Sequence, residues 1–335
     1  MPKKGKIYPL SRVEREEVQE FVKDQLRKGY IKLLKSPPTS PVFFVPKKDG
    51  KKRMVQDYRY LNSWTIKNNY LLPLISDLID SIGKKKMFMK IDLRWGYNNV
   101  RIKERDEWKA AFSMPEGSFE LTVMFFGLTN SPATFQAIMN NVLRDLVVEE
   151  KVTVFINDMM VAMETEEGYD EIVEEVLRRL EENDLFVKLE KCVWKVRKVG
   201  FLGVIMGEDG VRMEKEKVQG VVEWPVSKSV QDVQKFLGLA NYYKRFVKDF
   251  AKIAKLLHKM TRKETKWNWR ERQQKTFEEL KERLSGVVHT RVEVCRNGLR
   301  DKQTCGMTLA SAYVLHRLSV VWSQLQMKVG KSKWE

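Results

Sequence analysis

The chain of 335 residues is poor in the residue types that build disulfide-linked or zinc-bound domains. It contains 3 cysteines and 3 histidines, and no two cysteines have the Cys-x-x-Cys spacing of a zinc site. So sparse and odd a set of thiols excludes a disulfide framework and fits a reducing compartment, so we expect a cytosolic or nuclear protein. The histidines are isolated, and we interpret each as a surface or packing residue.

Long apolar stretches and signature loops are missing as well. Fully apolar runs span only a few residues, as at Val123–Phe126, whereas a membrane-spanning helix needs roughly 20. The first six residues, Met-Pro-Lys-Lys-Gly-Lys, lack the apolar segment of a signal peptide. We therefore expect neither a secreted protein nor a membrane partner. The sequence also contains no Walker loop, GxGxxG or HExxH motif and no nucleophile–base triad.

Positive charge is what the sequence has in excess. Lys and Arg number 62 against 45 Asp and Glu, which gives a net charge of +17. Such an excess attracts polyanions, nucleic acid above all, and says nothing about fold. With 43% hydrophobic and 10% aromatic residues the chain can bury a core, which excludes a wholly disordered protein. Its length suggests about two domains.

The amino-terminal part predicts a helix and then a basic hairpin. Ser11 and Glu14 have the spacing of a capping box at the start of a helix over residues 11–29. The apolar run 42–45 and a second run, 53–60, flank a basic turn and predict a hairpin with a cationic tip. Its lysines and arginines can hold a triphosphate or a nucleic-acid backbone, or form a solvated basic turn, and both interpretations stay open.

Two aspartates stand at the ends of predicted strands. Residues 87–93 place Met87, Met89, Ile91 and Leu93 on one face and Phe88, Lys90 and Asp92 on the other, which predicts a half-buried strand with Asp92 near its end. The apolar runs 152–156 and 159–163 are joined by Asn157-Asp158, which predicts a tight hairpin. If these strands are neighbours, Asp92 and Asp158 can share a divalent metal ion. Asn-Asp is also a good turn on its own, so the alternative of a purely structural turn stays open.

The remaining pattern is mainly helical. Ser131-Pro132 marks the start of a helix that runs to about residue 148. Further segments predict an amphipathic helix at 169–180, a mostly helical and charged region at 214–284 interrupted at Pro225, Gly238 and 267–269, and a tail at 287–335 without clear period.

Taken together, these segments resemble the reverse transcriptase of gypsy-like long-terminal-repeat retroelements, in order and from about residue 7 to 286. The most specific match is Phe126-Gly-Leu-Thr-Asn-Ser-Pro-Ala-Thr-Phe-Gln136, and Phe155-Ile-Asn-Asp158 occupies the place of the family's Tyr-x-Asp-Asp box. Other matching segments are 45–50, 57–62, 70–78, 90–97, 189–192, 200–203 and 229–246. So many motifs in one order make chance resemblance negligible.

The resemblance implies an α+β chain with the right-hand polymerase fold, made of fingers, an antiparallel-sheet palm and a mainly helical thumb. The implied boundaries are fingers 1–67 and 100–131, palm 68–99 and 132–206, thumb 207–286, and a tail 287–335 with no ribonuclease H pattern. The implied activity is RNA-directed DNA polymerisation, a nucleotidyl transfer to a primer 3′ end. Its implied cofactor is Mg²⁺ or Mn²⁺, and its implied partners are an RNA/DNA primer–template duplex and a deoxynucleoside triphosphate. No oligomeric state is implied.

The family's site roles carry over to particular positions of this sequence. The implied catalytic residues are Asp92, Asn157 and Asp158, with Asp92 and Asp158 as metal ligands. The implied nucleotide-binding residues are Lys47, Arg53, Tyr97, Phe126 and Gly127. The implied primer grip is Phe201, Leu202 and Gly203, and for Phe201 and Leu202 packing in the core is an equal alternative.

The sequence departs from the family at several of these places. Asn157 stands where the family has the first aspartate of its pair, and a neutral amide oxygen is a weaker metal ligand. We expect a loss of at least two powers of ten in rate, roughly 3 kcal/mol. Phe155 replaces a tyrosine, Phe125 a proline, Gln56 an apolar residue and Asp184 a glycine. These changes predict an impaired polymerase, with a catalytically inactive nucleic-acid-binding module or a non-functional relic as the alternatives.

Overall fold

The computed structural model describes residues 8–34, 40–46, 52–115, 117–262 and 265–286, with only the backbone at Arg53. Lys47, the predicted cationic tip and the 287–335 tail lie outside the described residues. The described chain forms two compact units. The first draws on residues within 1–73, 91–160 and 175–192, and the second on residues within 74–90, 161–174 and 193–335. None of the helices in the described ranges combines the length and the apolar character needed to cross a membrane.

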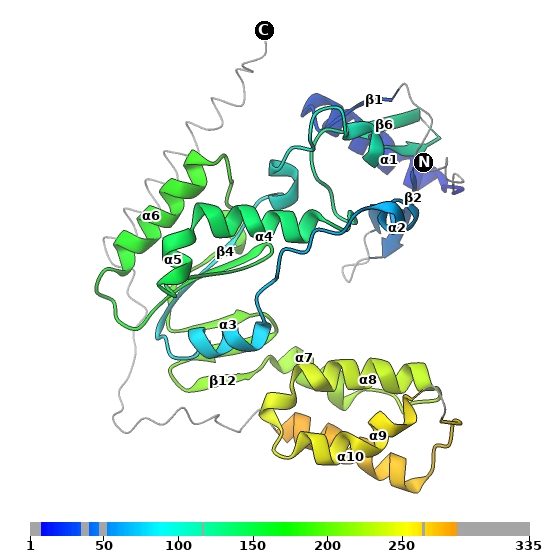
Figure 1. Cartoon of the computed structure of the whole chain (residues 1–335), viewed down its shortest axis with the longest axis vertical. Helices are drawn as coiled ribbons and strands as arrows, with labels where there is room; N and C mark the ends of the chain where they lie inside the picture. Colours follow the sequence, from blue (N-terminus) through cyan, green and yellow to red (C-terminus); the bar gives the residue numbers. More distant parts are fainter. Residues whose placement is uncertain (1–7, 35–39, 47–51, 116, 263–264, 287–335) are drawn as a thin grey trace. The chain divides into compact units, whose positions relative to one another are not determined.

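A five-stranded sheet organises the amino-terminal part of the first unit, in the order β1-β6-β5-β2-β3. Its strands are β1 (Ile31–Leu33), β2 (Ser40–Pro46), β3 (Lys52–Gln56), β5 (Phe112–Met114) and β6 (Gly117–Leu121). All neighbours are antiparallel except β2 and β5, which run parallel. Helix α1 (Arg12–Arg27) lies against β1 (Figure 1), and its Val18 and Val22 share a core with Phe112 and Leu121.

The start of α1 has the predicted capping box. The hydroxyl of Ser11 accepts a hydrogen bond from the N–H of Glu14 at 3.4 Å, and the Glu14 carboxylate accepts one from the N–H of Ser11 at 2.9 Å. These bonds satisfy backbone donors that the first turn of a helix otherwise leaves unpaired. Gly29 follows the helix with φ +67°, a conformation that glycine adopts without strain. The predicted helix is therefore confirmed, with its last turn two residues shorter.

The predicted hairpin is confirmed, but its second strand is shorter than expected. The prediction of a strand to residue 60 was wrong, because β3 ends at Gln56 and helix α2 (Arg59–Trp64) follows. The carboxylate of Asp57 accepts the backbone N–H of Arg59 at 3.2 Å and both guanidinium nitrogens Nε and Nη2 at 2.8 and 2.6 Å. This local cage turns the chain out of the strand and into the helix.

A four-stranded sheet in the order β7-β8-β4-β9 carries the aspartates. Its strands are β4 (Met87–Asp92), β7 (Val152–Phe155), β8 (Asp158–Met163) and β9 (Val193–Val196). The N–H of Lys86, just before β4, donates to the carbonyl of Met163 at the end of β8 (2.8 Å), so β4 and β8 run antiparallel. The end of β4 at Asp92 therefore lies beside the turn that opens β8.

The predicted hairpin of β7 and β8 is confirmed, but its turn lies one residue earlier than expected, at Ile156-Asn157, because Asp158 already belongs to β8. The prediction of a half-buried β4 was wrong. Phe88 was expected to face outward with Lys90 and Asp92, yet its side chain is completely buried. Lys90 and Asp92 are half-buried. The alternation of the sequence thus describes only the carboxyl end of β4, because the start of the strand is covered on both faces.

Three helices accompany this sheet: α4 (Ser131–Val142), α5 (Arg144–Val148) and α6 (Tyr169–Glu182). Both α4 and α5 contact β7. The single helix predicted to run to about residue 148 is interrupted at Leu143, which has φ −111° and ψ 23°. The last carbonyl groups of α4 consequently need partners from outside the helix.

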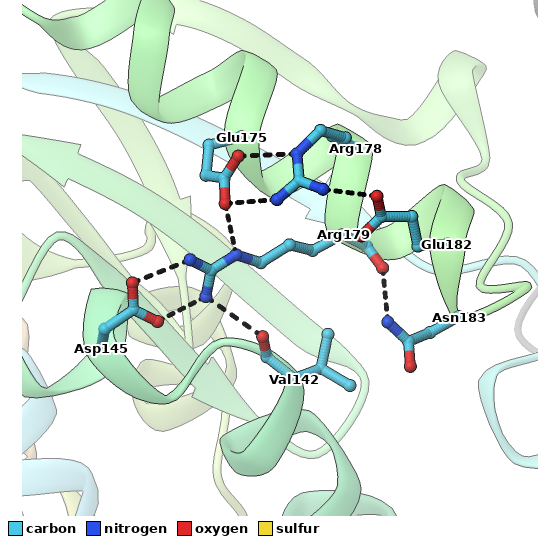
Figure 2. A network of polar contacts seen from close by, with 7 residues as sticks. All are labelled: Val142, Asp145, Glu175, Arg178, Arg179, Glu182 and Asn183. Carbon is cyan, nitrogen blue, oxygen red and sulfur yellow. Dashed lines mark hydrogen bonds and ion pairs between the residues drawn. The ribbon is translucent and has the colours of Figure 1, made fainter.

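Arg179 of α6 supplies one of these partners (Figure 2). Its guanidinium donates to the carbonyl of Val142 at 3.3 Å, to both carboxylate oxygens of Asp145 and to Glu175 at 2.6 Å. Arg178 pairs with the same glutamate through two bonds. The Arg179 guanidinium holds the pKa of Asp145 down at about 2, and Arg178 followed by Arg179 does the same for Glu175. The network ties α6 to the break between α4 and α5.

The second unit contains a small sheet and a helical bundle, besides α3 (Ile75–Ile82). Antiparallel strands β10 (Lys198–Phe201), β11 (Val204–Gly207) and β12 (Gly210–Met213) form the sheet. Helices α7 (Lys215–Val222), α8 (Val230–Tyr242), α9 (Phe250–Met260) and α10 (Glu271–Gly286) follow and lie together (Figure 1). Phe236, Leu257 and Phe277 are buried between them. The expected interruption at Gly238 was wrong, because this glycine lies inside α8.

Candidate active site

The turn between β7 and β8 presents the residues of the predicted catalytic pair. Ile156 has φ +56°, a strained conformation for a β-branched residue, and such strain gathers at functional sites. Its backbone N–H donates to Oε1 of Gln136 at 2.7 Å, and Nε2 of Gln136 donates to the carbonyl of Val154 at 3.0 Å. Gln136 is completely buried in α4. One side chain of the helix therefore holds both sides of the strained turn.

Asn157, the residue after Ile156, places its amide oxygen in the same turn. Its Oδ1 is buried and has no hydrogen-bond partner among the described residues. A Cβ atom built on Gly96 would lie 2.8 Å from this oxygen and 3.0 Å from Cζ of Phe135. Glycine at position 96 thus permits the close approach of the turn. A buried polar atom without a partner costs about 1–3 kcal/mol, and such an atom in a native structure marks strain or a place for a water molecule or an ion.

Asp92 and Asp158 belong to neighbouring strands at the same end of the sheet as Asn157. Asp92 ends β4 with its side chain 35% exposed, and its Oδ2 lies 4.0 Å from Nζ of Lys191. Asp158 opens β8 and is half-buried. Across the described ranges no three His, Cys, Asp or Glu side chains are grouped as metal ligands. The end of the sheet therefore gathers two carboxylates and one amide oxygen.

An aromatic wall follows the first aspartate. Tyr97 lies in a short 3₁₀ helix (Gly96–Asn99), is 4% exposed, and its ring centre is 4.7 Å from that of Phe126 and 5.5 Å from that of Phe135. Burial raises the pKa of Tyr97, so its hydroxyl stays protonated at neutral pH. Phe126 is 58% exposed, and Gly127 beside it has φ +98°. The structure thus brings Tyr97, Phe126 and Gly127 together.

The predicted cationic residues are described only in part. Arg53 lies on β3 opposite Val45, and its side chain is outside the described residues, as is the whole of Lys47. Their approach to a nucleotide stays a prediction.

The predicted primer grip is the turn between β10 and β11, in the second unit. Leu202 has φ +48° and Gly203 φ +74°, the two positive values of a type I′ hairpin turn. Phe201 is completely buried, so its side chain packs in the core, and the half-exposed Leu202 and Gly203 form the accessible part. The hydroxyls of Tyr242 and Tyr243 donate to the carbonyls of Leu202 and Gly203, the second at 3.2 Å.

Sequence reasoning assigned no role to two residues that shape the first unit's site. Gln136 holds the turn between β7 and β8, and Asn62 of α2 bonds the carbonyl of Gly127 (2.7 Å) and the N–H of Thr129 (2.9 Å). A signal for Gln136 was present, because it is a polar residue next to Phe135 on the apolar face of a predicted helix. For Asn62 the chain offers no comparable local signal, since its partners lie more than sixty residues away.

Comparison with known proteins agrees with this geometry. Residues 45–206 match the family described as reverse transcriptase (RNA-dependent DNA polymerase). The chain is 32% identical over 277 residues to the Transposon Tf2-3 polyprotein of Schizosaccharomyces pombe, covering 83% of this chain and 21% of the relative. It is 34% identical over 267 residues to the retrovirus-related Pol polyprotein from transposon 297 of Drosophila melanogaster, covering 78% and 25%. The chain thus spans a quarter or less of these relatives.

Solved structures show the same fold. The foamy viral protease–reverse transcriptase dRH in complex with double-stranded DNA has a TM-score of 0.76 at 26% identity, covering 85% of this chain and 50% of that one. The foamy viral protease–reverse transcriptase in complex with RNA/DNA hybrid has a TM-score of 0.73 at 25% identity, covering 86% and 38%.

The fold and the comparisons together place the chain in the class of proteins with the right-hand polymerase fold. The α+β architecture with fingers, an antiparallel-sheet palm and a mainly helical thumb, predicted from the sequence, is confirmed. The chain belongs to the reverse transcriptase family, in its gypsy-like long-terminal-repeat retrotransposon branch.

Proposed function

We propose that this chain is an RNA-directed DNA polymerase that grips a primer–template duplex and transfers nucleotides at a strongly reduced rate. One observation carries the proposal: in a reverse transcriptase domain, the end of β4 with Asp92 lies beside the turn that carries Asn157 and Asp158. Asn157, at the first position of the aspartate pair, therefore lies at this end of the sheet but carries a neutral amide instead of a carboxylate.

The donor set fits a weakened divalent-cation site. Asp92, Asp158 and Asn157 offer hard oxygen ligands of the kind that Mg²⁺ and Mn²⁺ take, and the buried Oδ1 of Asn157 has no partner in the described protein. When bound, a pair of such cations stabilises the attacking and leaving oxygens of a phosphoryl transfer. Two carboxylates balance half of the charge of two divalent cations, which supports weaker binding than three carboxylates give. Asn157 is accordingly the residue that limits the rate.

The remaining residues serve to hold substrates. Tyr97 lies under the sugar of the incoming nucleotide and excludes a 2′-hydroxyl, while Phe126 and Gly127 line the nucleotide pocket. Lys47 and Arg53 contact the triphosphate, as a point charge and a two-pronged donor respectively. The contact between the buried ring of Tyr97 and the exposed ring of Phe126 supports this arrangement.

Duplex binding is supported by charge and by one glycine. The net charge of +17 favours a polyanion, and the two foamy viral structures hold double-stranded DNA and an RNA/DNA hybrid. Gly238 lies inside α8 with open space around the position of an added Cβ, so packing does not require it, although glycine weakens a helix. Close approach of a nucleic-acid strand to the α8 backbone explains the glycine at this position.

Our proposed division of the chain remains fingers 1–67 and 100–131, palm 68–99 and 132–206, and thumb 207–286.

Single-nucleotide incorporation tests the proposal. A labelled DNA primer on an RNA template is mixed with excess protein, one deoxynucleoside triphosphate and Mg²⁺ or Mn²⁺. We expect slow, metal-dependent extension that Asp92→Ala abolishes, and the exposed Asp209→Ala serves as the matched control. Extension that persists in Asp92→Ala would contradict the assigned site.

A second candidate is a duplex-binding module without polymerisation, which the neutral side chain of Asn157 favours. It predicts no extension by the wild-type chain, together with RNA/DNA hybrid binding that persists in EDTA. The logarithm of the affinity should then fall linearly with the logarithm of the salt concentration. Absence of both extension and binding would leave a non-functional relic.

A further inference from the structure

Two consecutive tyrosines at the end of α8 bind one two-residue turn. Tyr242 donates its hydroxyl to the carbonyl of Leu202, and Tyr243 donates its hydroxyl to the carbonyl of Gly203 at 3.2 Å. Their rings meet edge to face with centres 4.8 Å apart. Burial raises the pKa of both tyrosines, so both hydroxyls remain donors at neutral pH. The turn is therefore held by two donors from one helix.

The shape of the turn fits this attachment. A Cβ atom on Gly203 would lie 2.9 Å from the hydroxyl oxygen of Tyr243, so only glycine leaves room for that hydroxyl. The carbonyl of Gly203 also accepts the N–H of Glu214, the residue before α7, at 3.4 Å. The start of α7 and the end of α8 are thus both bonded to Gly203 in the β10–β11 hairpin.

The two tyrosines differ in what else they do. Tyr243 is 2% exposed and belongs to the core, whereas Tyr242 is 38% exposed although its hydroxyl is bound. Tyr242 lies four residues after Gly238, on the same exposed side of α8. The accessible ring of Tyr242 and the Leu202 turn consequently form one continuous surface.

We propose that Tyr242 and Tyr243 are positioning residues that join the β10–β11 turn to α8, so that both contact a bound duplex as one rigid surface. The inference rests on the proposed binding of a primer–template duplex. A turn fixed in advance loses less entropy when the duplex binds, and the gain appears mainly as slower dissociation.

The test compares Tyr242→Phe and Tyr243→Phe with Tyr60→Phe, which changes an exposed tyrosine on α2 whose hydroxyl makes no hydrogen bond within the described residues. A fluorescent RNA/DNA hybrid is released from the full chain by excess unlabelled hybrid, and hydrogen exchange is measured at residues 202–204. We expect the hybrid to dissociate about two- to tenfold faster from Tyr242→Phe and from Tyr243→Phe than from the wild-type chain, the range that one hydrogen bond supplies. Exchange should rise at the turn and not throughout α8–α10. Tyr60→Phe should change neither quantity.

A second pair of variants guards against simple unfolding. Gly203→Ala sets a methyl group against the Tyr243 hydroxyl, and Tyr243→Phe removes that hydroxyl. Gly203→Ala should therefore speed dissociation more in the wild-type background than in Tyr243→Phe.

Each other outcome has a distinct meaning. Faster exchange at the turn with unchanged dissociation overturns the inference while leaving duplex binding intact. Unchanged exchange at the turn overturns it as well. A wild-type chain that binds no hybrid contradicts the proposed function itself, and the inference falls with it.

Discussion

Replacement of Gln136 by methionine should loosen the catalytic turn more than any comparable change on α4. The side chain is completely buried and makes three hydrogen bonds, to the N–H of Ile156 (2.7 Å), the carbonyl of Val154 (3.0 Å) and Oδ1 of Asn140 (2.9 Å). Methionine has a similar shape and no such donors or acceptors. Leaving the buried carbonyl of Val154 and the part-buried N–H of Ile156 without this partner should cost about 1–3 kcal/mol each, hence about 2–6 kcal/mol together when Asn140 turns to water.

Urea unfolding and amide hydrogen exchange measure this effect. We expect a lower free energy of unfolding and much faster exchange at Ile156, because its only described partner is gone and its φ of +56° is unfavourable. Gln136→Glu provides a chemical control: burial raises the pKa of the new carboxyl, and its neutral form can both accept from Ile156 and donate to Val154. The glutamate variant should therefore regain stability as the pH falls.

The exposed Gln19 on α1 offers the matched substitution, and Gln19→Met should change stability by less than about 0.5 kcal/mol. A Gln136→Met chain as stable as this control, with exchange at Ile156 unchanged, would refute the reasoning.

Three further predictions concern helices and their ends. Arg179→Met should flatten the acid dependence of stability. The lowered pKa of Asp145 stabilises the fold above the unfolded pKa of about 3.9, and this stabilisation is lost as the pH falls towards 2. The difference between the urea midpoints at pH 7 and pH 2.5 should therefore shrink in the variant, and a difference equal to that of the wild-type chain would count against the network. Asp184→Gly should raise stability by about 1 kcal/mol, since Asp184 has φ +55°, while Asp184→Ala should not; equal thermal midpoints for both would contradict this. Gly238→Ala should stabilise α8 by about 1 kcal/mol, and the larger Gly238→Leu should weaken hybrid binding in an anisotropy titration; undiminished affinity would remove the proposed contact.

Much of the fold could be predicted because its signals are local. The capping box at Ser11 and the hairpin of β7 and β8 each depend on residues within a few positions of one another, although the turn of the hairpin lies one residue earlier than predicted. Features that depend on distant contacts could not be predicted in this way. Phe88 is buried because the start of β4 is covered on both faces of its sheet, and β2 pairs in parallel with β5 some seventy residues on. Gly238 lies inside α8, and beyond its own helix no described atom lies within 4 Å of the position of an added Cβ.

The same division holds at the site. Asp92 and Asp158 could be singled out by their places at strand ends, but their approach required β4 and β8 to be neighbours, which no local pattern encodes. The backbone of Asp184 explains why the family usually has a glycine at this position, since a glycine suits φ +55° better than an aspartate. The resemblance supplied the roles of Tyr97 and Gly127, whereas the work of Gln136 became visible only from its bonds to Val154 and Ile156.

The central claim is that an intact scaffold carries one decisive lesion at Asn157. A carboxylate there would be buried against Gly96 and Phe135, so Asn157→Asp should be less stable without divalent cations and gain more thermal stability than wild type when Mn²⁺ is added.

The most direct test is the rate of primer extension on an RNA template by Asn157→Asp relative to the wild-type chain. Asn69→Asp, an exposed change of the same charge, is the control, and Asp92→Ala is added to the aspartate variant as the negative. We predict that Asn157→Asp extends the primer at least about a hundredfold faster, a difference of roughly 3 kcal/mol, and that Asp92→Ala abolishes the gain. Equal rates for Asn157→Asp and wild type would contradict the claim.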